Sequence, residues 1–281
     1  MNYRHAYHAG NFADVVKHAV LARILTYMKL KRQPFRVIDT HAGIGLYDLS
    51  SAQAQKTGEW QDGIGRVVAA RFDAPVRQLL QPYLDAVVHV NAGGGITHYP
   101  GSPLIARYLM RREDVLVLNE LHPEDCAALK TATNNMPNTK VLSLDGFVAL
   151  KSLLPPKERR GVILIDPPFE AADEFDRVAD GLRDGLSRFS NGIFAVWYPV
   201  KSEASAERFV DRMTGAGTIK ALDARLSISA PFPGLGLTET GFFVINPPYL
   251  LAAELEDMLP PLAEVLEQGS GYGSRIRRWG L

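Results

Sequence analysis

The chain has 281 residues, of which 46% are hydrophobic and 22% are charged, so it can form one domain with a full hydrophobic core. Its 31 basic and 31 acidic residues give a formal net charge of zero, which excludes a uniformly cationic nucleic-acid-binding protein but allows a local basic face. The single cysteine, Cys126, excludes an intramolecular disulfide and a multi-cysteine zinc site. We see no signal peptide and no apolar run long enough to span a membrane, and therefore expect a cytoplasmic protein.

The chain begins with a polar stretch rich in aromatic residues and histidine, residues 2–11, for which we predict an ordered loop. Apolar residues then recur at helical spacing over residues 12–28, which predicts a helix. His5, His8 and His18 could suggest a metal site. No carboxylate-rich partner set accompanies them, so we predict no metal.

The first predicted strand, residues 35–39, ends at Asp39 and runs into a turn containing Gly43 and Gly45. An acid at a strand end followed by Gly-x-Gly is typical of a nucleotide-binding turn, because glycine lets the backbone approach a ligand closely. The full dinucleotide fingerprint is absent, since position 48 is Asp48, so a smaller adenosyl cofactor fits better than NAD. A plain turn between a strand and a helix remains the alternative.

About fifty residues, 47–98, separate the first predicted strand from the second, which is too many for one crossover helix. The segment begins with polar residues, and its stretches 67–72 and 76–90 have amphipathic helical patterns. We therefore predict one domain, residues 1–281, with a small helical insertion over about 47–98.

Acidic side chains follow four successive predicted strands, namely Asp39, Glu120, Asp145 and Asp166. Because the carboxyl ends of parallel strands meet at one edge of a sheet, we interpret this row, together with Gly146, as a nucleoside-binding pocket. The acid after the second strand, Glu120, is placed to accept hydrogen bonds from ribose hydroxyls. Ser102 and Pro103 predict the N-cap and first turn of a helix through residue 112.

An uninterrupted apolar run, residues 161–165, leads into Asp166-Pro167-Pro168-Phe169. Such a run predicts a strand buried on both faces, and the prolines end it. Asp166 and a proline carbonyl can accept the two N–H groups of an exocyclic amine, while Phe169 can stack on the ring that carries it. Asp/Asn-Pro-Pro-aromatic is the signature of methyltransferases that act on amino nitrogens. The alternative is a strand ended by an ordinary Pro-Pro turn.

A second motif of this type, Asn-Pro-Pro-Tyr at 246–249, follows the last predicted strand, residues 241–245. The preceding strand, 219–229, is connected to it by a loop without a helix, which predicts a hairpin and an antiparallel last strand. Asn246 would then lie at the opposite edge of the sheet, so we assign the chemistry to Asp166. The tail, 275–279, could contact phosphate or be solvated.

These residues resemble the ribosomal large-subunit RNA methyltransferase J family, the adenine-N6 methyltransferases of 23S rRNA, over nearly the whole chain. The resemblance is carried by Tyr-Arg-His at 3–5, His-Ala-Gly-Asn at 8–11, Lys17-His18, Asp39-Thr40-His41-Ala42-Gly43, Pro100-Gly101-Ser102-Pro103, Glu120-Leu121-His122-Pro123, Asp145-Gly146 and Asp166-Pro167-Pro168. One departure is Phe169, where the family has tyrosine. Stacking survives that change, whereas a contact through the hydroxyl does not.

The resemblance implies an α/β, Rossmann-like class I fold that depends on S-adenosylmethionine, with a seven-stranded, mostly parallel sheet, an antiparallel last strand and a helical insertion. It implies cofactor contacts from His18, His41, Ser102, Glu120, Asp145, Gly146 and Asp166, to which the first turn adds Asp39 and Gly43. Asp166 would be catalytic. The expected substrate contacts are Tyr3, His5, Lys17, Pro167, Pro168 and Phe169, with Tyr3 moving near the adenine site when the cofactor binds.

The implied partner is 23S rRNA, which we expect to be protein-free or in early assembly when it is methylated. We expect the enzyme to be a monomer and to have no membrane partner. Alternatives are methylation of DNA adenine, methylation of a protein glutamine, and a non-catalytic RNA-binding module. The compact size and the lack of a recognition domain disfavour the first of these. The intact motif at Asp166 argues against the last. The insertion could contact RNA or simply stabilise the fold.

Overall fold

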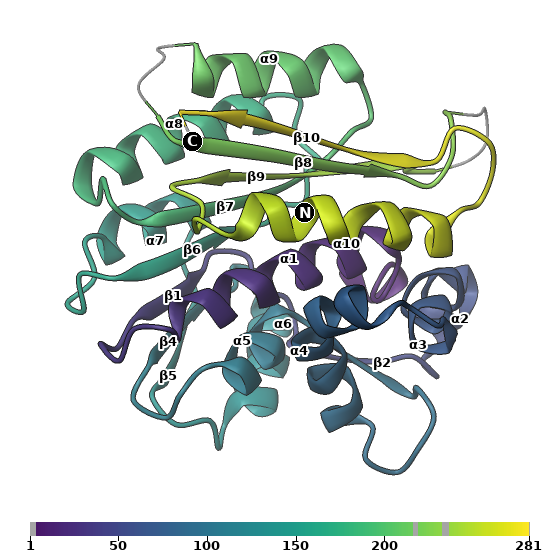
Figure 1. Cartoon of the computed structure of the whole chain (residues 1–281). Coiled ribbons are helices and arrows are strands. Elements are labelled where there is room, and N and C mark those ends of the chain that lie inside the picture. Colours follow the sequence, from purple (N-terminus) through teal and green to yellow (C-terminus); the bar gives the residue numbers. More distant parts are fainter. Residues whose placement is uncertain (1–3, 216–218, 232–235, 281) are drawn as a thin grey trace.

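The computed structural model describes residues 4–215, 219–231 and 236–280 (Figure 1). Within these ranges, the centre of the molecule is an eight-stranded mixed sheet. In spatial order it contains β10 (Gly273–Trp279), β8 (Ala221–Ser227), β9 (Glu239–Ile245), β7 (Ile193–Pro199), β6 (Gly161–Ile165), β1 (Arg36–Asp39), β4 (Val115–Asn119) and β5 (Thr139–Leu142). The five strands from β7 to β5 pair in parallel, whereas β9 is antiparallel to both of its neighbours. The predicted mostly parallel sheet with an antiparallel β9 is confirmed.

The predicted count of seven strands is wrong, because the tail forms an eighth. Residues 273–279 pair with β8 along its whole length, antiparallel, at the edge of the sheet. This segment contains three arginines and little apolar alternation, so its sequence resembles a solvated tail. Ion pairs hold it in place instead, since Arg277 bonds Glu207 at 2.6 Å and Asp223 at 2.9 Å.

Helices cover both faces of the sheet (Figure 1). They are α1 (Phe12–Met28), α5 (Ser102–Leu109), α6 (Pro123–Thr133), α7 (Gly146–Leu153), α8 (Glu174–Arg188), α9 (Glu203–Thr214) and α10 (Leu251–Leu266), preceded by a 3-10 turn, η1 (His5–Tyr7). Alternate residues of β6 point to different cores: Val162 and Leu164 pack beneath α1 and α10, and Ile163 and Ile165 beneath α8 and α9. None of the described helices combines the length and the apolar character that crossing a membrane requires.

The segment between β1 and α5 departs from the alternation of strands and helices. It contains β2 (Leu46–Asp48), α2 (Ala52–Thr57), a π-helical turn η2 (Gln61–Gly65), α3 (Arg66–Ala69), α4 (Ala74–Val90) and β3 (His98–Pro100). β2 and β3 pair with each other rather than with the main sheet. The segment packs against the start of the chain, where the Ile64 amide donates to the Gly10 carbonyl at 2.9 Å. It thereby reaches the cavity described below.

Asn246 lies at the edge of the sheet where β7 begins. Its side-chain amide donates to the carbonyls of Ser190 and Gly192, both at 2.8 Å, immediately before β7. Asp166 follows the last residue of the neighbouring strand β6 and therefore lies at the opposite edge. The predicted hairpin and the opposite placement of the two motifs are confirmed, and Asn246 binds the backbone rather than facing Asp166.

Candidate active site

A cavity of about 700 Å³ opens where the parallel strands end. Its walls come from the turns after β1, β4, β5, β6 and β7, from the first turns of α1, and from the segment between β2 and β3. It brings together most of the predicted site residues: His5, Lys17, His18, His41, Gly43, Ser102, Glu120, Asp145, Gly146, Asp166, Pro167 and Pro168. Asp39 and Phe169 lie outside the lining, and Tyr3 lies outside the described residues.

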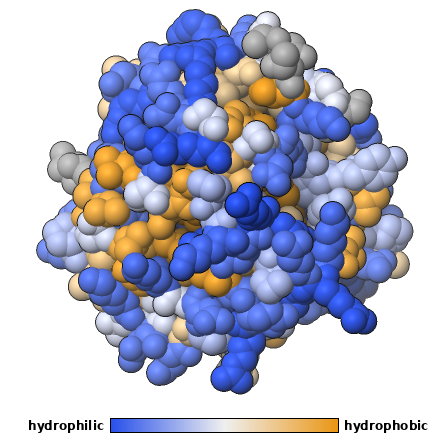
Figure 2. Space-filling view, turned by 90° about the vertical axis from the view of Figure 1, so that its left-hand side faces the viewer, coloured by the Kyte–Doolittle hydropathy of each residue, from blue (hydrophilic) through white to orange (hydrophobic). Residues whose placement is uncertain are grey.

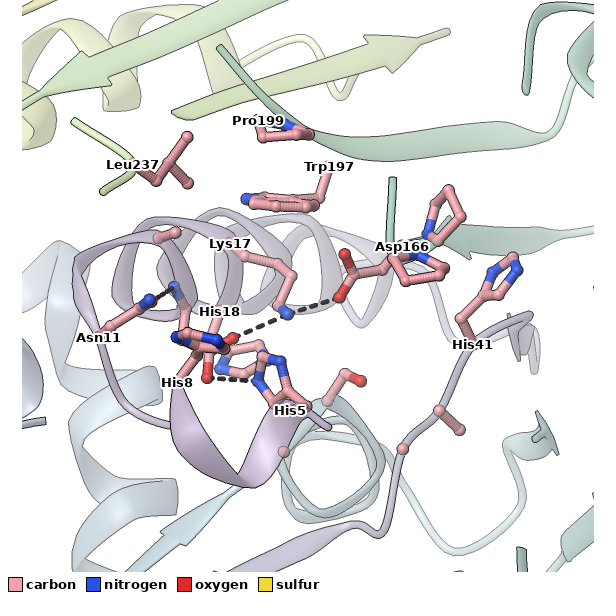
Figure 3. Close-up of a pocket in the computed structure, with 18 of the residues that line it drawn as sticks. His5, His8, Asn11, Lys17, His18, His41, Asp166, Trp197, Pro199 and Leu237 are labelled. Atoms are coloured by element: carbon pink, nitrogen blue, oxygen red, sulfur yellow. Dashed lines mark hydrogen bonds and ion pairs between the residues drawn. The ribbon is translucent and has the colours of Figure 1, made fainter. Parts of the chain in front are cut away.

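Asp166 is joined to the first turns of α1 through Lys17 (Figure 3). The Lys17 ammonium lies 2.5 Å from Asp166 Oδ2 and 2.8 Å from Asp14 Oδ1. All three side chains are largely buried, with exposed fractions of 5% for Lys17, 15% for Asp166 and 2% for Asp14. Burial alone would lower the pKa of Lys17, but the two carboxylates outweigh it and raise that pKa well above its usual value.

Asp14 is held by an N-terminal helix motif that is visible in the sequence. Asn11 caps α1 by accepting the Asp14 amide at 3.0 Å, and the Asp14 carboxylate accepts the Gly10 amide at 2.9 Å. The same carboxylate lies 2.9 Å from His5 Nε2. Burial would raise the pKa of Asp14, but His5 and Lys17 hold it well below its usual range. The cap therefore places a buried anion directly behind Lys17.

Glu120 and Asp145 present carboxylate oxygens to another part of the cavity. Glu120 accepts the amides of Gly43 and His122, both at 2.9 Å. Its pKa is raised by burial, a shift that these two hydrogen bonds oppose. One oxygen of Asp145 caps α7, while the other accepts from Arg177 at 3.2 Å. Both carboxylates are thus oriented by the backbone and keep oxygen lone pairs that a ligand can use.

Two glycines let the backbone approach the cavity closely. Gly43 has φ +62°, and a Cβ there would lie 2.3 Å from the Tyr47 hydroxyl oxygen. A Cβ on Gly146 would lie 2.6 Å from the His41 ring. Side chains at either position would fill this part of the cavity, which explains why glycine is found at both.

Two of the histidines that line the cavity, His18 and His41, are held in the neutral form. Burial lowers the pKa of His41 to about 4, and its Nδ1 lies 2.8 Å from the Thr40 hydroxyl. Burial also lowers the pKa of His18 well below its usual value, and its Nδ1 lies 2.7 Å from the Tyr99 hydroxyl. Within the described residues, His18 Nε2 is buried without a hydrogen-bond partner, an arrangement that proteins avoid unless a ligand or water completes it.

Ser102 does not cap its helix, so that prediction is wrong. Gly101 takes the extended N-cap conformation, Ser102 enters the first turn, and no side chain caps the helix. The Ser102 hydroxyl instead donates to Asp39 Oδ2 at 2.6 Å. Asp39 is buried, which raises its pKa to about 7. It therefore lies behind Ser102 and supports the cavity wall rather than facing the cavity.

Phe169 is turned into the core. It is 7% exposed, has φ +49°, and packs against Phe175 and Trp197, with ring centroids 4.9 and 5.9 Å apart. Beside Asp166, Trp197 lines the cavity instead, and its ring centroid lies 5.8 Å from the Lys17 ammonium (Figure 3). Trp197 escapes notice in the sequence because it stands in the apolar run of β7. The available signal is its place near the strand's carboxyl end, just before Pro199.

The N-terminal histidines have separate partners. His5 contacts Asp14, and His18 contacts Tyr99. His8 Nδ1 lies 2.9 Å from Glu59 Oε1, while the Asn11 side-chain amide donates to Glu59 Oε2 at 2.9 Å. No group of three or more metal-ligating side chains occurs in the part of the chain that the structure describes. The contact with Glu59 instead ties the segment between β2 and β3 to the cavity rim.

The sheet order and the row of acids at its carboxyl edge define a Rossmann-like class I methyltransferase. A family model described as ribosomal RNA large subunit methyltransferase D, RlmJ, matches residues 32–280, and the chain belongs to this family. It is 41% identical to ribosomal RNA large subunit methyltransferase J of Escherichia coli K12 over 275 residues, covering 98% of this chain and 97% of that protein. The protein of the same name from Haemophilus influenzae is 40% identical over 280 residues, covering 99% and 98%. A crystal structure of protein LPL1258 from Legionella pneumophila superposes with a TM-score of 0.89 at 34% identity, covering 97% of this chain and 99% of that one.

Proposed function

We propose that this protein transfers a methyl group from S-adenosylmethionine to the exocyclic N6 of an adenine in 23S ribosomal RNA. The observation that carries the proposal is the shared cavity: the Asp166-Pro167-Pro168 turn and the carboxylates of Glu120 and Asp145 line the same space. The relatives' names add the nucleic acid, because both curated relatives are ribosomal RNA large subunit methyltransferases.

The cavity residues fit an adenosyl cofactor. Glu120 would accept hydrogen bonds from the ribose hydroxyls, while Asp145 and the bare backbone at Gly146 would border the nucleoside. Leu121, 48% exposed, and Phe147 would contact the faces of the adenine. The remaining, polar part of the cofactor would be held by His41, Ser102 and the unpartnered His18 Nε2. Gly43 would allow close approach of the backbone, and Asp39 would support Ser102.

S-adenosylmethionine, when bound, supplies a methyl carbon attached to a positively charged sulfur. The chain's own task is to present a poor nucleophile, because the lone pair of the adenine amine is delocalised into the ring. Asp166 Oδ2 already accepts from Lys17, so Oδ1 remains for one amine N–H, and the Pro167 carbonyl accepts the other. Transfer of the methyl group from sulfur to nitrogen would place positive charge on the nitrogen. Asp166 would stabilise that charge and take the proton that the nitrogen loses.

Lys17 and Asp14 orient the reacting carboxylate. Lys17 holds one oxygen of Asp166 in place, and Asp14 balances the Lys17 charge so that the group of three keeps a net negative charge. This net negative charge stabilises the positive charge that develops on the amine. His5 lies on Asp14 at the cavity wall and Tyr3 is near it in sequence, which supports placing both at the substrate.

The target base would be unpaired or flipped into the cavity. Trp197 offers the stacking face, and Phe169 supports Trp197 through an edge-to-face contact, a changed role for the aromatic residue of the motif. We further propose that a monomer acts in the cytoplasm on protein-free or early-assembly RNA. The segment 47–98 reaches the cavity through Thr57, Glu59 and Asp62, which supports a role of that insertion in RNA contact within a single domain.

The proposal is tested by supplying tritium-labelled methyl donor with separate pools of RNA, DNA and protein. We expect label in 23S rRNA alone, recovered as N6-methyladenosine after nuclease digestion, and none with Asp166→Ala. Label in DNA or in protein glutamine would identify one of the alternative enzymes. A folded protein that binds RNA and labels no pool would be the non-catalytic module.

A further inference from the structure

The end of the sheet opposite the candidate active site carries a dense group of cations. Segments 29–36, 111–114 and 157–160 contain nine lysines and arginines but only three acids, in a chain whose formal net charge is zero. They lead into β1, β4 and β6, which lie side by side with Arg36 level with Val115 and Gly161. We call this continuous region the amino-edge surface. Figure 2 looks onto this end of the molecule, where hydrophilic residues surround a smaller apolar area.

Hydrogen bonds from arginine side chains to backbone carbonyls hold the three segments together. The Arg111 guanidinium donates to the carbonyls of Lys31, Arg32 and Gln33 at 3.1, 3.0 and 3.2 Å. Arg160 also donates to the Gln33 carbonyl. The loop after α1 is therefore bound through its backbone, and the side chains of Lys31 and Arg32 are left exposed. The surface is a fixed part of the fold rather than a loose tail.

The few acids in this region are already engaged. Glu158 bonds Arg36 at 2.9 Å, and the buried Asp114 accepts from Arg111 at 3.0 Å and from the Phe35 amide at 3.1 Å. Five exposed cations have no carboxylate within ion-pair distance among the described residues, namely Lys31, Arg32, Arg112, Lys157 and Arg159. Their charge is therefore uncompensated within the part of the protein that is described.

The cations also repel one another. Partial burial lowers the pKa of Lys29, and the nearby Arg111 lowers it further. Arg159 has φ +52°, an uncommon conformation for a residue with a side chain, in a turn closed by its amide and the Pro156 carbonyl at 3.0 Å. Crowded, unpaired cations on a rigid edge attract a polyanion, because the anion relieves the repulsion and releases its own counterions.

We propose that the amino-edge surface binds the phosphate backbone of the RNA substrate, at a distance from the target base. The choice of RNA rests on the proposed function, since the charge pattern alone selects a polyanion. The cations are spread along an edge, which suits contacts to successive phosphates and provides positioning without reading sequence.

This surface and the active site lie at opposite ends of the strands. From Gly161 to Asp166 the chain spans five residues of β6, about 17 Å at ~3.3 Å per residue. A short hairpin carrying the target base fills the cavity without reaching this surface. A longer RNA contacts both, so the surface strengthens binding of long substrates and leaves the chemical step unchanged.

The test compares two double variants of the full-length chain, Lys31→Gln/Arg32→Gln and Lys157→Gln/Arg159→Gln, with a control. Arg183→Gln/Arg208→Gln removes the same charge from exposed positions on α8 and α9. Binding of a full-length 23S rRNA transcript is measured over a range of salt concentrations, together with methylation of that transcript and of a short hairpin cut from it. Binding to vesicles of phosphatidylcholine and phosphatidylserine is measured in parallel.

We expect each amino-edge double variant to bind the long transcript at least fivefold more weakly. The slope of log affinity against log salt should fall by about two, since each lost phosphate contact removes about one unit. The short hairpin should be methylated at the wild-type rate, and the control variant should match the wild type throughout. Equal slopes in all four proteins, or loss of vesicle binding with unchanged RNA affinity, would overturn the inference. A wild type that binds the transcript but methylates no RNA would overturn the proposed function instead, and the salt slopes would still decide the role of the surface.

Discussion

The Lys17 ammonium lies 2.5 Å from Asp166 Oδ2 and 2.8 Å from Asp14 Oδ1, so a single buried cation bridges two carboxylates. Only one of the two anions, Asp166, lies in the Asp-Pro-Pro turn. The other is supplied by the capped first turn of α1, far away in sequence. The orientation and charge of the motif therefore depend on a helix at the start of the chain.

This bridge predicts opposite effects of its two supporting residues on the pH profile. Lys17→Met removes a positive charge beside Asp166, so the acid limb of kcat/KM should move to higher pH and kcat should fall about 10²–10³-fold. Asp14→Asn removes a negative charge and should move the acid limb the other way or leave it in place. The profiles are measured on RNA below the melting temperature of each variant, because unpairing a buried charge costs about 3–5 kcal/mol. If the acid limbs of the two variants moved in the same direction, this role of Lys17 and Asp14 would be contradicted.

His41 predicts a loss of stability in mild acid. Its pKa is lowered to about 4 in the folded protein, against about 6.5 when unfolded, so the unfolded state binds the proton first as pH falls. The contribution of neutral His41 to the free energy of unfolding is present above pH 6.5 and is lost between about pH 6.5 and 4. The loss amounts to at most about 3 kcal/mol. Asp39, with its pKa raised to about 7, makes the folded protein more stable as the pH falls over the same range. Because both the wild type and a His41 variant contain Asp39, a comparison of the two cancels its contribution.

The measurement is the free energy of unfolding in urea at pH 7 and pH 4 for the wild type and His41→Asn. We expect the wild type to lose up to about 3 kcal/mol more than the variant between these two pH values. Equal losses in the two proteins would show that His41 does not titrate as described.

Trp197 and Phe169 should differ in what their removal changes. Trp197→Ala should remove about 1–3 kcal/mol of stacking energy and lower kcat/KM on RNA accordingly. Its melting temperature should change less than that of Phe169→Ala. Phe169→Ala should chiefly destabilise the fold, by about 3–5 kcal/mol, because the ring is buried. Phe169→Leu, which keeps an apolar side chain and most of the volume at this position, should retain methyl transfer. A fully active Trp197→Ala would show that another group stacks on the base.

Glu120 should contribute to cofactor affinity without acting on RNA. Glu120→Ala should weaken S-adenosylmethionine binding by about 1.5–3 kcal/mol, the cost of losing hydrogen bonds to a charged group. Calorimetry on the wild type and the variant measures this directly, with NAD as the control ligand. Tight NAD binding without S-adenosylmethionine binding would contradict the cofactor assignment.

Much of the fold and site could be predicted because it depends on local patterns. Apolar runs that end in acids place Asp39, Glu120, Asp145 and Asp166 at successive strand ends, and the connection without a helix reverses β9. β10 could not be predicted, because ion pairs to Glu207 and Asp223, remote in sequence, hold a strand with little apolar pattern.

The errors at the site come from single-residue geometry. The positive φ of Phe169 turns its ring into the core, and no feature of the Pro-Pro-Phe sequence shows that rotation. The helix after Gly101 begins one residue earlier than the Ser-Pro pair suggests, which directs the Ser102 hydroxyl to Asp39. Trp197 belongs to a strand whose other residues are mainly core, so only the fold shows that its ring reaches the cavity.

The central claim is that methyl transfer occurs at Asp166 and not at the similar motif of Asn246. The most direct measurement is single-turnover transfer of tritium-labelled methyl to 23S rRNA by Asp166→Ala and Asn246→Ala, with cofactor binding and melting temperature measured on the same samples. Asp166→Ala should remain folded and lose nearly all transfer, whereas Asn246→Ala should lose only stability, because its amide bonds the backbone before β7. A folded Asn246→Ala without transfer, beside an active Asp166→Ala, would contradict the account.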